Sequence, residues 1–401
     1  MLAPTIATIA DTLGRAAAER LRTTAVAAAT RSRRTRIGID IRPFYEPLTG
    51  VGWYLYFLLH EFARHEGVDL YLFGDARVTD LGPRLHADVP ANARLCTFDL
   101  RGKQISRLTR PLTAGAYVAW MQTIGCDVFF GANYFLPRLM SAVARRRVIT
   151  IHDLTYKRYP GLLQKETLAN LEAQMAREIA VADAIVCVSE STRRDVLRHY
   201  QVDPSRVVAI HSGVAAPPPP EPVAGLPRRY ILFVGTVEPR KNLRTLLDAW
   251  ARLRASGAYD GELVVVGRLG WESAEMARRL REPGVRHLDY LNAGQLSTVY
   301  RHADVFVFPS IYEGFGFPLL EAMAHGVPAI AARSSSLPEI GGEAALYFDP
   351  RDDAALAREL RRVTEDAALR EELIAKGRRR VQQFRWEEAA AKTLDVLRRV
   401  A

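Results

Sequence analysis

Cysteine is scarce in this chain of 401 residues, and the three that occur, Cys96, Cys126 and Cys187, lie far apart in the sequence. They form no CxxC pair and no His/Cys cluster, so we expect neither a disulfide framework nor a structural zinc site. This usage is typical of a protein in a reducing cytoplasm. No stretch approaches the ~20 uninterrupted apolar residues of a membrane-spanning helix. An integral membrane protein is therefore excluded, but a protein that binds to a membrane surface is not.

Motifs of three common enzyme classes are also missing. No Asp-x-Asp triplet occurs, so we expect no tightly bound metal ion. The lack of a GxxxxGK[ST] loop argues against a P-loop ATPase, and the lack of a GxSxG elbow argues against a serine hydrolase. If the chain acts on a diphosphate, Arg and Lys side chains must therefore offset its negative charge.

Positive charge is in excess and unevenly placed. The 55 Lys and Arg residues outnumber the 45 Asp and Glu residues, which gives a net charge of +10. Such an excess favours polyanionic partners. Half of it lies within residues 1–36, where seven arginines accompany two acidic residues, and residues 100–126 carry four basic residues and no acid. The N-terminal arm is either a disordered extension or a helix on an anionic membrane, with an apolar side formed by Leu2, Ile6, Ile9, Leu13 and Leu21.

Short apolar, β-branched runs alternate with helical patterns along most of the chain. This alternation predicts parallel sheets covered by helices on both faces. The strand candidates span 36–41, 69–73, 126–130, 147–151, 184–188, 207–210, 230–234, 262–266, 304–308, 328–331 and 345–348. The helix candidates span 53–63, 241–254, 295–302, 318–325, 353–363, 366–383 and 386–400.

Six prolines between residues 214 and 227 interrupt this alternation. Proline lacks an N–H and fixes φ, so the segment reads as a stiff linker between two α/β domains. We predict a basic N-terminal arm (1–35), a first Rossmann-like domain (36–214), a Pro-rich linker (215–228), a second Rossmann-like domain (229–385) and a C-terminal helix (386–401). The sequence is compatible with this C-terminal helix crossing back to the first domain, but does not require it.

Two glycine-containing segments follow predicted strands. Gly50 and Gly52 lie in TGVG before an apolar helix, where backbone amides and the helix dipole favour an anion; a plain tight turn explains them equally well. Gly235 begins the loop that leads to Arg240 and Lys241. Cations at the carboxyl edge of a sheet suit a diphosphate, although two solvated surface charges are the simpler interpretation.

The segment EGFGFPLLE at 313–321 carries the most specific signal. Glu313 and Glu321 are eight residues apart, on a glycine- and aromatic-rich loop and on the helix that follows it near Pro318. Carboxylates accept hydrogen bonds from the hydroxyls of a sugar or a ribose. A solvated helix face is the alternative, but glycines and aromatics favour a close-packed loop. His152, in IHDLTY after another strand, is by itself more often a structural histidine.

Together these segments resemble a GT-B glycosyltransferase of family 4, the retaining group that uses sugar nucleotides. EGFGFPLLE is similar to that family's E-x7-E motif, VGTVEPRKN at 234–242 to its diphosphate-binding loop, and GIDIRP with TGVG to its N-terminal glycine loop. HDL at 152–154 and the Trp386–Glu387 pair agree. The resemblance covers residues 36–400 approximately. The form GTxEPRKN is most similar to bacterial mannosyl- and rhamnosyltransferases of lipopolysaccharide and exopolysaccharide assembly.

The resemblance implies a role for each candidate residue. Arg240 and Lys241 would bind the donor diphosphate, and Glu321 would hold the ribose. His152 would contact the donor sugar near the reacting carbon. Gly50 and Gly52 of the first domain, and Gly235 in the loop before Arg240, would let the backbone approach the phosphates. The donor sugar would be held by Glu313 and by the amides of Gly314, Phe315, Gly316 and Phe317.

The fold expected from the resemblance is α/β of the GT-B type, two Rossmann-like domains with parallel sheets facing across a cleft. The resemblance implies that the first domain (36–214) lies on the acceptor side and that the second (229–385) binds the nucleotide sugar. The expected reaction moves a hexosyl residue, with mannose from GDP-mannose as the first choice, to a lipid-linked saccharide. No cofactor or metal is expected. The expected location is cytoplasmic, peripheral on the inner face of the cytoplasmic membrane, where the acid-free segment 100–126 would meet the lipid diphosphate.

Three alternatives remain open at this point. The donor can be GDP-rhamnose, dTDP-rhamnose or a UDP-sugar. The same architecture also serves sugar-nucleotide epimerases, which need no acceptor. A nucleic-acid-binding protein rests only on the net charge and predicts steeply salt-dependent DNA affinity; the partners we expect are a nucleotide sugar, a lipid-linked saccharide and an anionic membrane surface.

Overall fold

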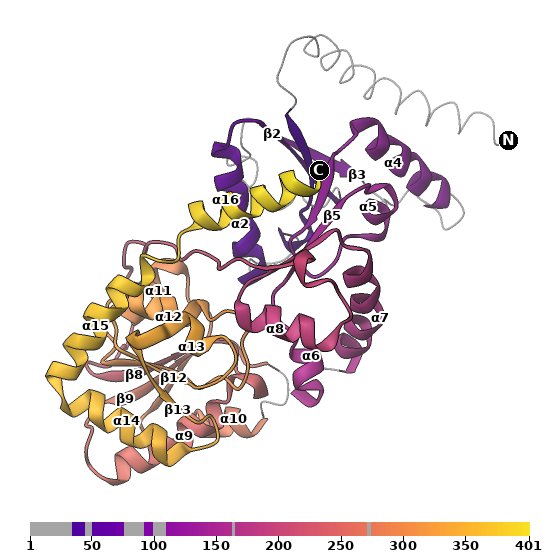
Figure 1. Cartoon of the computed structure of the whole chain (residues 1–401). Coiled ribbons are helices and arrows are strands. Elements are labelled where there is room, and N and C mark those ends of the chain that lie inside the picture. The colour runs from indigo at the N-terminus through magenta and orange to yellow at the C-terminus, as the bar shows by residue number, and fades with distance from the viewer. Residues whose placement is uncertain (1–33, 45–49, 76–91, 99–109, 163–164, 271–273) are drawn as a thin grey trace.

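The computed structural model describes residues 34–44, 50–75, 92–98, 110–162, 165–270 and 274–401. They form two α/β units, each built on a parallel sheet with helices on both faces (Figure 1). The predicted fold class is confirmed. Residues 1–33 of the basic arm lie outside the described residues, and with them the whole of its predicted apolar side.

The first sheet has seven strands in the order β3-β2-β1-β4-β5-β6-β7, all parallel. Its central strand β4 is buried at every position, as expected for a sheet covered on both faces. The sequence patterns did not predict β3, an edge strand that contains Arg94. The strands are β1 (Thr35–Asp40), β2 (Val68–Asp75), β3 (Ala93–Phe98), β4 (Val128–Gly131), β5 (Arg147–Ile151), β6 (Ala184–Cys187) and β7 (Val207–Ala209).

The helices of this unit include the strongly apolar α2, which begins at Gly50, three residues earlier than predicted. Tyr54, Leu58 and Phe62 are buried at helical spacing and fix α2 against the sheet. The helix α8 begins after Ser189, whose hydroxyl caps it by accepting from the Thr192 amide. The helices are α2 (Gly50–Arg64), α4 (Arg110–Ile124), α5 (Arg138–Val143), α6 (Thr155–Arg158), α7 (Lys165–Val181) and α8 (Glu190–His199).

The second sheet has six parallel strands in the order β10-β9-β8-β11-β12-β13. The predicted strands 262–266 and 345–348 coincide with β9 and β13, whereas β10, which contains Arg286 and His287, was missed. The strands are β8 (Tyr230–Val234), β9 (Glu262–Val266), β10 (Val285–Leu288), β11 (Val305–Phe308), β12 (Ala329–Ala332) and β13 (Ala345–Phe348).

One predicted helix start in the second unit is wrong. Arg240 and Lys241 do not open an α-helix; they end a 3-10 turn (Pro239–Lys241). Asn242, with φ 57°, has a left-handed backbone conformation that separates this turn from α9. The short helices α10 and α13 were not predicted. The helices are α9 (Leu243–Ala255), α10 (Ala274–Arg279), α11 (Ala293–Arg301), α12 (Phe317–Ala324), α13 (Leu337–Gly341), α14 (Asp353–Glu365), α15 (Ala367–Val381) and α16 (Trp386–Val400).

The C-terminal helix α16, yellow in Figure 1, leaves the second unit and lies along α2 of the first. The Trp386 ring stacks on Phe57 at 5.0 Å between centroids and meets the edge of Tyr54 at 6.0 Å. A Cβ on Gly213 would lie 2.4 Å from the backbone nitrogen of Trp386, so only glycine fits at position 213. The chain thus crosses between the two units twice, at adjoining places. Within the described ranges, no helix combines the length and apolarity needed to cross a bilayer.

Candidate functional site

A buried ionic cluster lies where the carboxyl edge of the second sheet faces the first unit. The Glu313 carboxylate is 2.7 Å from the Lys241 Nζ and 2.9 Å from an Arg240 guanidinium nitrogen. The cations follow β8 and Glu313 follows β11; these strands are neighbours in the sheet, so their loops meet. Arg240 also donates to Glu238 at 2.7 Å and to the Tyr312 carbonyl at 2.9 Å. Two cations therefore share one carboxylate in a site with little solvent.

The cluster is held in its ionised form. Burial alone raises the pKa of Glu313, but the charges of Arg240 and Lys241 outweigh it and bring that pKa down to about 2. Burial lowers the pKa of Lys241, an effect that Glu313 partly opposes. For Arg240 the carboxylates outweigh burial, and its pKa is raised. The site thus offers preorganised positive charge to an anion that takes the place of Glu313.

The glycine-rich loop after Glu313 is one of the points at which the two units touch. The Gly314 carbonyl accepts a hydrogen bond from the Ser189 hydroxyl at 2.6 Å, and a Cβ on Gly314 would lie 1.7 Å from the His152 carbonyl oxygen. Gly316, with φ 121°, then turns the chain into α12. That helix begins at Phe317, so Pro318 occupies its second position rather than its first.

The backbone amides of residues 314–317 donate to no other described residue. The first amides of a helix have no partner within the helix itself. The hydrogen-bonding capacity of these amides is therefore unused within the described part of the chain.

Glu321 lies in α12 and has a different environment from Glu313. It is half-buried, and the Tyr300 hydroxyl donates to its Oε2 at 3.0 Å. Burial raises the pKa of Glu321, an effect that Tyr300 partly offsets. No cation neutralises Glu321 in the described part of the chain, so the two glutamates of the motif have distinct chemistry.

His152 follows β5 and is packed between the rings of Tyr54 and Tyr134, at 5.0 and 5.8 Å between centroids. Its Nε2 lies 2.7 Å from the Ala132 carbonyl. A carbonyl can only accept, so the ring hydrogen is on Nε2. Burial lowers the pKa of His152. The imidazole is therefore neutral at pH 7, with Nδ1 as its acceptor.

The remaining predicted glycines differ in how strongly the fold requires them. Gly50 is exposed, and nothing lies within 4 Å of the position of a Cβ, whereas Gly52 is buried in α2. Gly235, with φ 155°, passes close to Gly267, whose own Cβ would lie 2.1 Å from the Gly235 carbonyl. Packing thus requires glycine at Gly267, beside Gly235, but does not explain Gly50.

Comparison with known proteins decides the family. A model described as Glycosyltransferase Family 4 matches residues 48–216, and one described as Glycosyl transferases group 1 matches residues 221–380. The chain is 31% identical over 377 residues to O-antigen chain mannosyltransferase B of Escherichia coli, covering 88% of this chain and 97% of that protein. It belongs to the GT-B glycosyltransferases of family 4. The resemblance seen in the sequence is confirmed.

Two other similar proteins widen the picture of this glycosyltransferase. It is 32% identical over 354 residues to the D-inositol 3-phosphate glycosyltransferase of Streptomyces bingchenggensis, covering 80% of this chain and 74% of that one. The solved structure of Anabaena HepE in complex with UDP-glucose superposes with a TM-score of 0.66 at 17% identity, covering 91% and 100% of the two chains. The latter match shows the shared fold.

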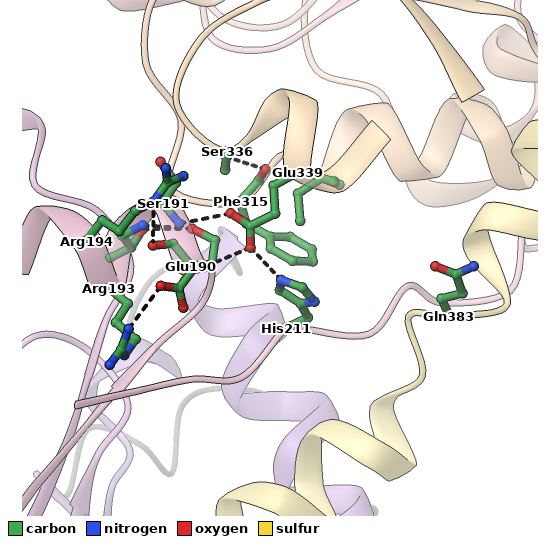
Figure 2. Close-up of polar contacts among 12 residues, drawn as sticks. Glu190, Ser191, Arg193, Arg194, His211, Phe315, Ser336, Glu339 and Gln383 are labelled. Atoms are coloured by element: carbon green, nitrogen blue, oxygen red, sulfur yellow. Dashed lines mark hydrogen bonds and ion pairs between the residues drawn. The ribbon is translucent and has the colours of Figure 1, made fainter. Parts of the chain in front are cut away.

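The glycosyltransferase has a second contact between its units, which the sequence patterns did not reveal (Figure 2). Glu339 of α13 accepts hydrogen bonds from the Glu190 and Ser191 amides at 2.7 and 2.8 Å, and its Oε1 lies 2.6 Å from His211 Nε2. A carboxylate at the N-terminus of α8 is favoured by the helix dipole. Burial raises the pKa of Glu339, but His211 and the two amides outweigh it and lower that pKa. We call this set of contacts the Glu339 clasp.

Tyr312, directly before Glu313, makes a third contact across the units. Its hydroxyl donates to Asp195 at 2.7 Å and accepts from the Leu154 amide at 3.2 Å. A hint existed in the sequence, since Tyr312 belongs to the same unusual loop as the predicted glutamate. Among the described residues, no group of three or more His, Cys, Asp or Glu side chains is arranged to hold a metal ion.

Proposed function

We propose that this glycosyltransferase is a retaining mannosyltransferase that uses GDP-mannose and acts on a lipid-linked saccharide in cell-surface polysaccharide synthesis. The observation that carries the proposal is the buried Arg240–Lys241–Glu313 cluster at the carboxyl edge of the second sheet. The similarity to an O-antigen mannosyltransferase over nearly its whole length supports mannose as the sugar. Open α/β sheets bind their ligands at such edges.

The donor diphosphate would bind to Arg240 and Lys241 in place of Glu313. These half-buried cations then stabilise the negative charge that develops on the leaving nucleoside diphosphate. Glu313, freed from its ion pairs, accepts hydrogen bonds from hydroxyls of the mannosyl group. The unpartnered amides of residues 314–317 hold the same sugar from the other side.

The other predicted residues would orient the donor. Glu321 accepts hydrogen bonds from the ribose hydroxyls. His152 is neutral and carries its hydrogen on Nε2, so Nδ1 accepts from a sugar hydroxyl near the reacting carbon. Gly50 and Gly52 place the N-terminus of α2 near the phosphates, and Gly235 allows the second unit to approach them closely.

The transfer step retains the anomeric configuration. The acceptor hydroxyl oxygen attacks C1 of mannose on the face from which the phosphate departs, a new C1–O bond forms and the bond from C1 to the phosphate oxygen breaks. The acceptor proton passes to the departing phosphate oxygen. The contacts across the two units limit the access of water, and with it hydrolysis of the donor.

Two comparisons keep other substrates in view. The HepE structure was determined with UDP-glucose, which makes a UDP-sugar a second candidate donor, beside GDP-rhamnose and dTDP-rhamnose. The similarity to D-inositol 3-phosphate glycosyltransferase makes a small phosphorylated acceptor a second candidate acceptor. Donor conversion without any acceptor would instead favour an epimerase.

A thermal-shift screen of purified protein tests the donor. GDP-mannose, UDP-glucose, UDP-GlcNAc and dTDP-rhamnose are compared at equal concentrations. A ligand that binds only the folded state stabilises it by about 2.7 kcal/mol at 100 times its Kd. We expect GDP-mannose to give the largest increase in Tm. An increase with a UDP- or dTDP-sugar alone would contradict the proposed donor.

A further inference from the structure

A pocket of about 660 Å³ opens between the two units beside the Glu313 loop. Its walls come from α6, α8 and the turn after α6 in the first unit, and from the loops after β11, β12 and β13 in the second. Tyr312 and Ser335 form the wall nearest to Glu313, and the Ser335 hydroxyl accepts from the Glu313 amide at 2.7 Å. Arg240 and Lys241 are not part of the lining. The pocket therefore adjoins the candidate donor site but is separate from its cations.

Arginine dominates the lining of this pocket. The two carboxylates in the lining are already engaged: Asp195 with the Tyr312 hydroxyl and, at 3.6 Å, with Arg158, and Asp349 with the Arg351 amide at 2.8 Å. The pocket arginines come from both units: Arg158, Arg194 and Arg198 from the first, and Arg333 and Arg351 from the second.

Four of these arginines lack a matching acid. Among the described residues, no carboxylate lies within ion-pair distance of Arg194, Arg198, Arg333 or Arg351. Guanidinium groups that line one pocket repel one another, and an anion bound among them relieves that repulsion. Their planar donors match the oxygens of a phosphoryl group, and the Ser335 hydroxyl keeps its own hydrogen to donate.

We propose that this pocket binds a phosphoryl group and that the bound group joins the two units from both sides. The chemistry is that of a phosphate or diphosphate ester, which can belong either to a free phosphorylated compound or to the phosphorylated end of the acceptor. A ligand held by Arg198 of α8 and by Arg333 after β12 stabilises the closed arrangement. It also lies next to the loop that carries Glu313, so its binding is coupled to that of the donor.

Isothermal calorimetry of inorganic pyrophosphate binding at low salt tests the pocket without any turnover. Its result is therefore independent of whether the proposed transfer reaction is correct. Because pyrophosphate can also occupy the donor site, the full chain carries Lys241→Ala in every sample. If that variant does not fold, Lys241 is kept, and the donor site is filled with the nucleoside diphosphate of the nucleotide sugar that the donor screen identifies.

The informative variant of the pocket is Arg198→Gln/Arg333→Gln. Its matched control is Arg361→Gln/Arg399→Gln, which removes the same charge from exposed positions outside the pocket. We expect the pocket variant to weaken pyrophosphate binding about tenfold, as for the loss of two charge-assisted contacts at exposed groups, and the control to change it less than about twofold. Equal affinities in the two double variants would overturn the proposal.

A second arm identifies the source of the phosphoryl group in wild-type protein. Inhibition of transfer by pyrophosphate that is competitive with a lipid-linked diphosphate acceptor, and that weakens in Arg198→Gln/Arg333→Gln, assigns the pocket to the acceptor. Pyrophosphate binding that the pocket variant weakens but that does not compete with the acceptor assigns the pocket to a free phosphorylated ligand. Transfer is assayed at a saturating concentration of donor, which keeps pyrophosphate out of the donor site. Both results support a phosphoryl site, whereas inhibition unchanged by the pocket variant counts against it.

Discussion

The Lys241 ammonium lies 2.7 Å from Glu313, and the two residues come from loops at the carboxyl ends of adjacent strands. Arg240 holds the other oxygen of the same carboxylate at 2.9 Å. The proposed donor site of this glycosyltransferase thus contains its own anion, in the place where the account puts the negative charge of the donor. Each step proposed for the diphosphate follows from exchanging that anion for the donor.

These cations lead to a prediction about metal ions. Because the proposal has Arg240 and Lys241 supply the positive charge that a divalent ion supplies elsewhere, we expect transfer to proceed at an undiminished rate in excess EDTA. The rate is measured with GDP-mannose and acceptor before and after chelation. Loss of activity in EDTA that Mg²⁺ or Mn²⁺ restores would refute this prediction.

The Gly314 contact leads to a prediction about closure of the two units. In Gly314→Ala the new Cβ would lie 1.7 Å from the His152 carbonyl, so the loop or the facing unit must move. Displacement of a site by about 1 Å costs roughly 100-fold in rate, and we expect a loss of that order in kcat/KM. The control is Gly115→Ala in α4, where nothing lies within 4 Å of the Cβ. Equal activity in the two variants would contradict the role of this contact.

The Glu339 clasp leads to a prediction about pH. The folded-state pKa of Glu339 is lowered from its ordinary 4.5, so its contribution to stability is complete above about pH 4.5 and is lost as the pH falls through the folded pKa. We expect Glu339→Gln to reduce Tm by about 2 °C at pH 7, as for about 1 kcal/mol. The difference from wild type should shrink below pH 4.5.

Thermal unfolding at several pH values measures this effect. The control is Glu343→Gln, which changes an exposed carboxylate on the same unit. A Tm difference that stays constant across the acid range would show that Glu339 does not stabilise the fold through its charge.

The basic arm leads to a prediction about membranes. The full chain should sediment with vesicles that contain anionic lipid and not with neutral vesicles, because each Lys or Arg near an anionic surface contributes about 1 kcal/mol. Deletion of residues 1–34 should abolish this sedimentation. Circular dichroism of both proteins verifies that the two α/β units remain folded. Equal sedimentation of both proteins would assign membrane binding, if any, to the remainder of the chain.

Most strands were predictable because central parallel strands are continuous apolar runs. The two that were missed, β3 and β10, are edge strands of their sheets. An edge strand is only partly covered, so it tolerates Arg94 in one case and Arg286 with His287 in the other. Their sequences therefore lack the uninterrupted apolar pattern on which the strand predictions depended.

The candidate site was predictable as single residues but not as a constellation. Glu313, Arg240 and Lys241 each stood out by position after a strand or by an unusual loop. Their ion pairs depend on β8 lying beside β11, a consequence of sheet order rather than of local sequence. The Glu339 clasp could not be predicted for a related reason: both of its amide donors belong to the other unit, so the contact depends on how the two units pack and not on local sequence.

The most direct measurement is transfer of labelled mannose from GDP-mannose to a lipid-linked saccharide by the wild-type chain and by Lys241→Ala. We predict acceptor-dependent transfer by the wild type. In Lys241→Ala we predict loss of most turnover, about 100-fold or more as for a lost transition-state donor, together with weaker donor binding. Transfer by Lys241→Ala at nearly the wild-type rate, or conversion of the donor by the wild type without acceptor, would contradict the assignment.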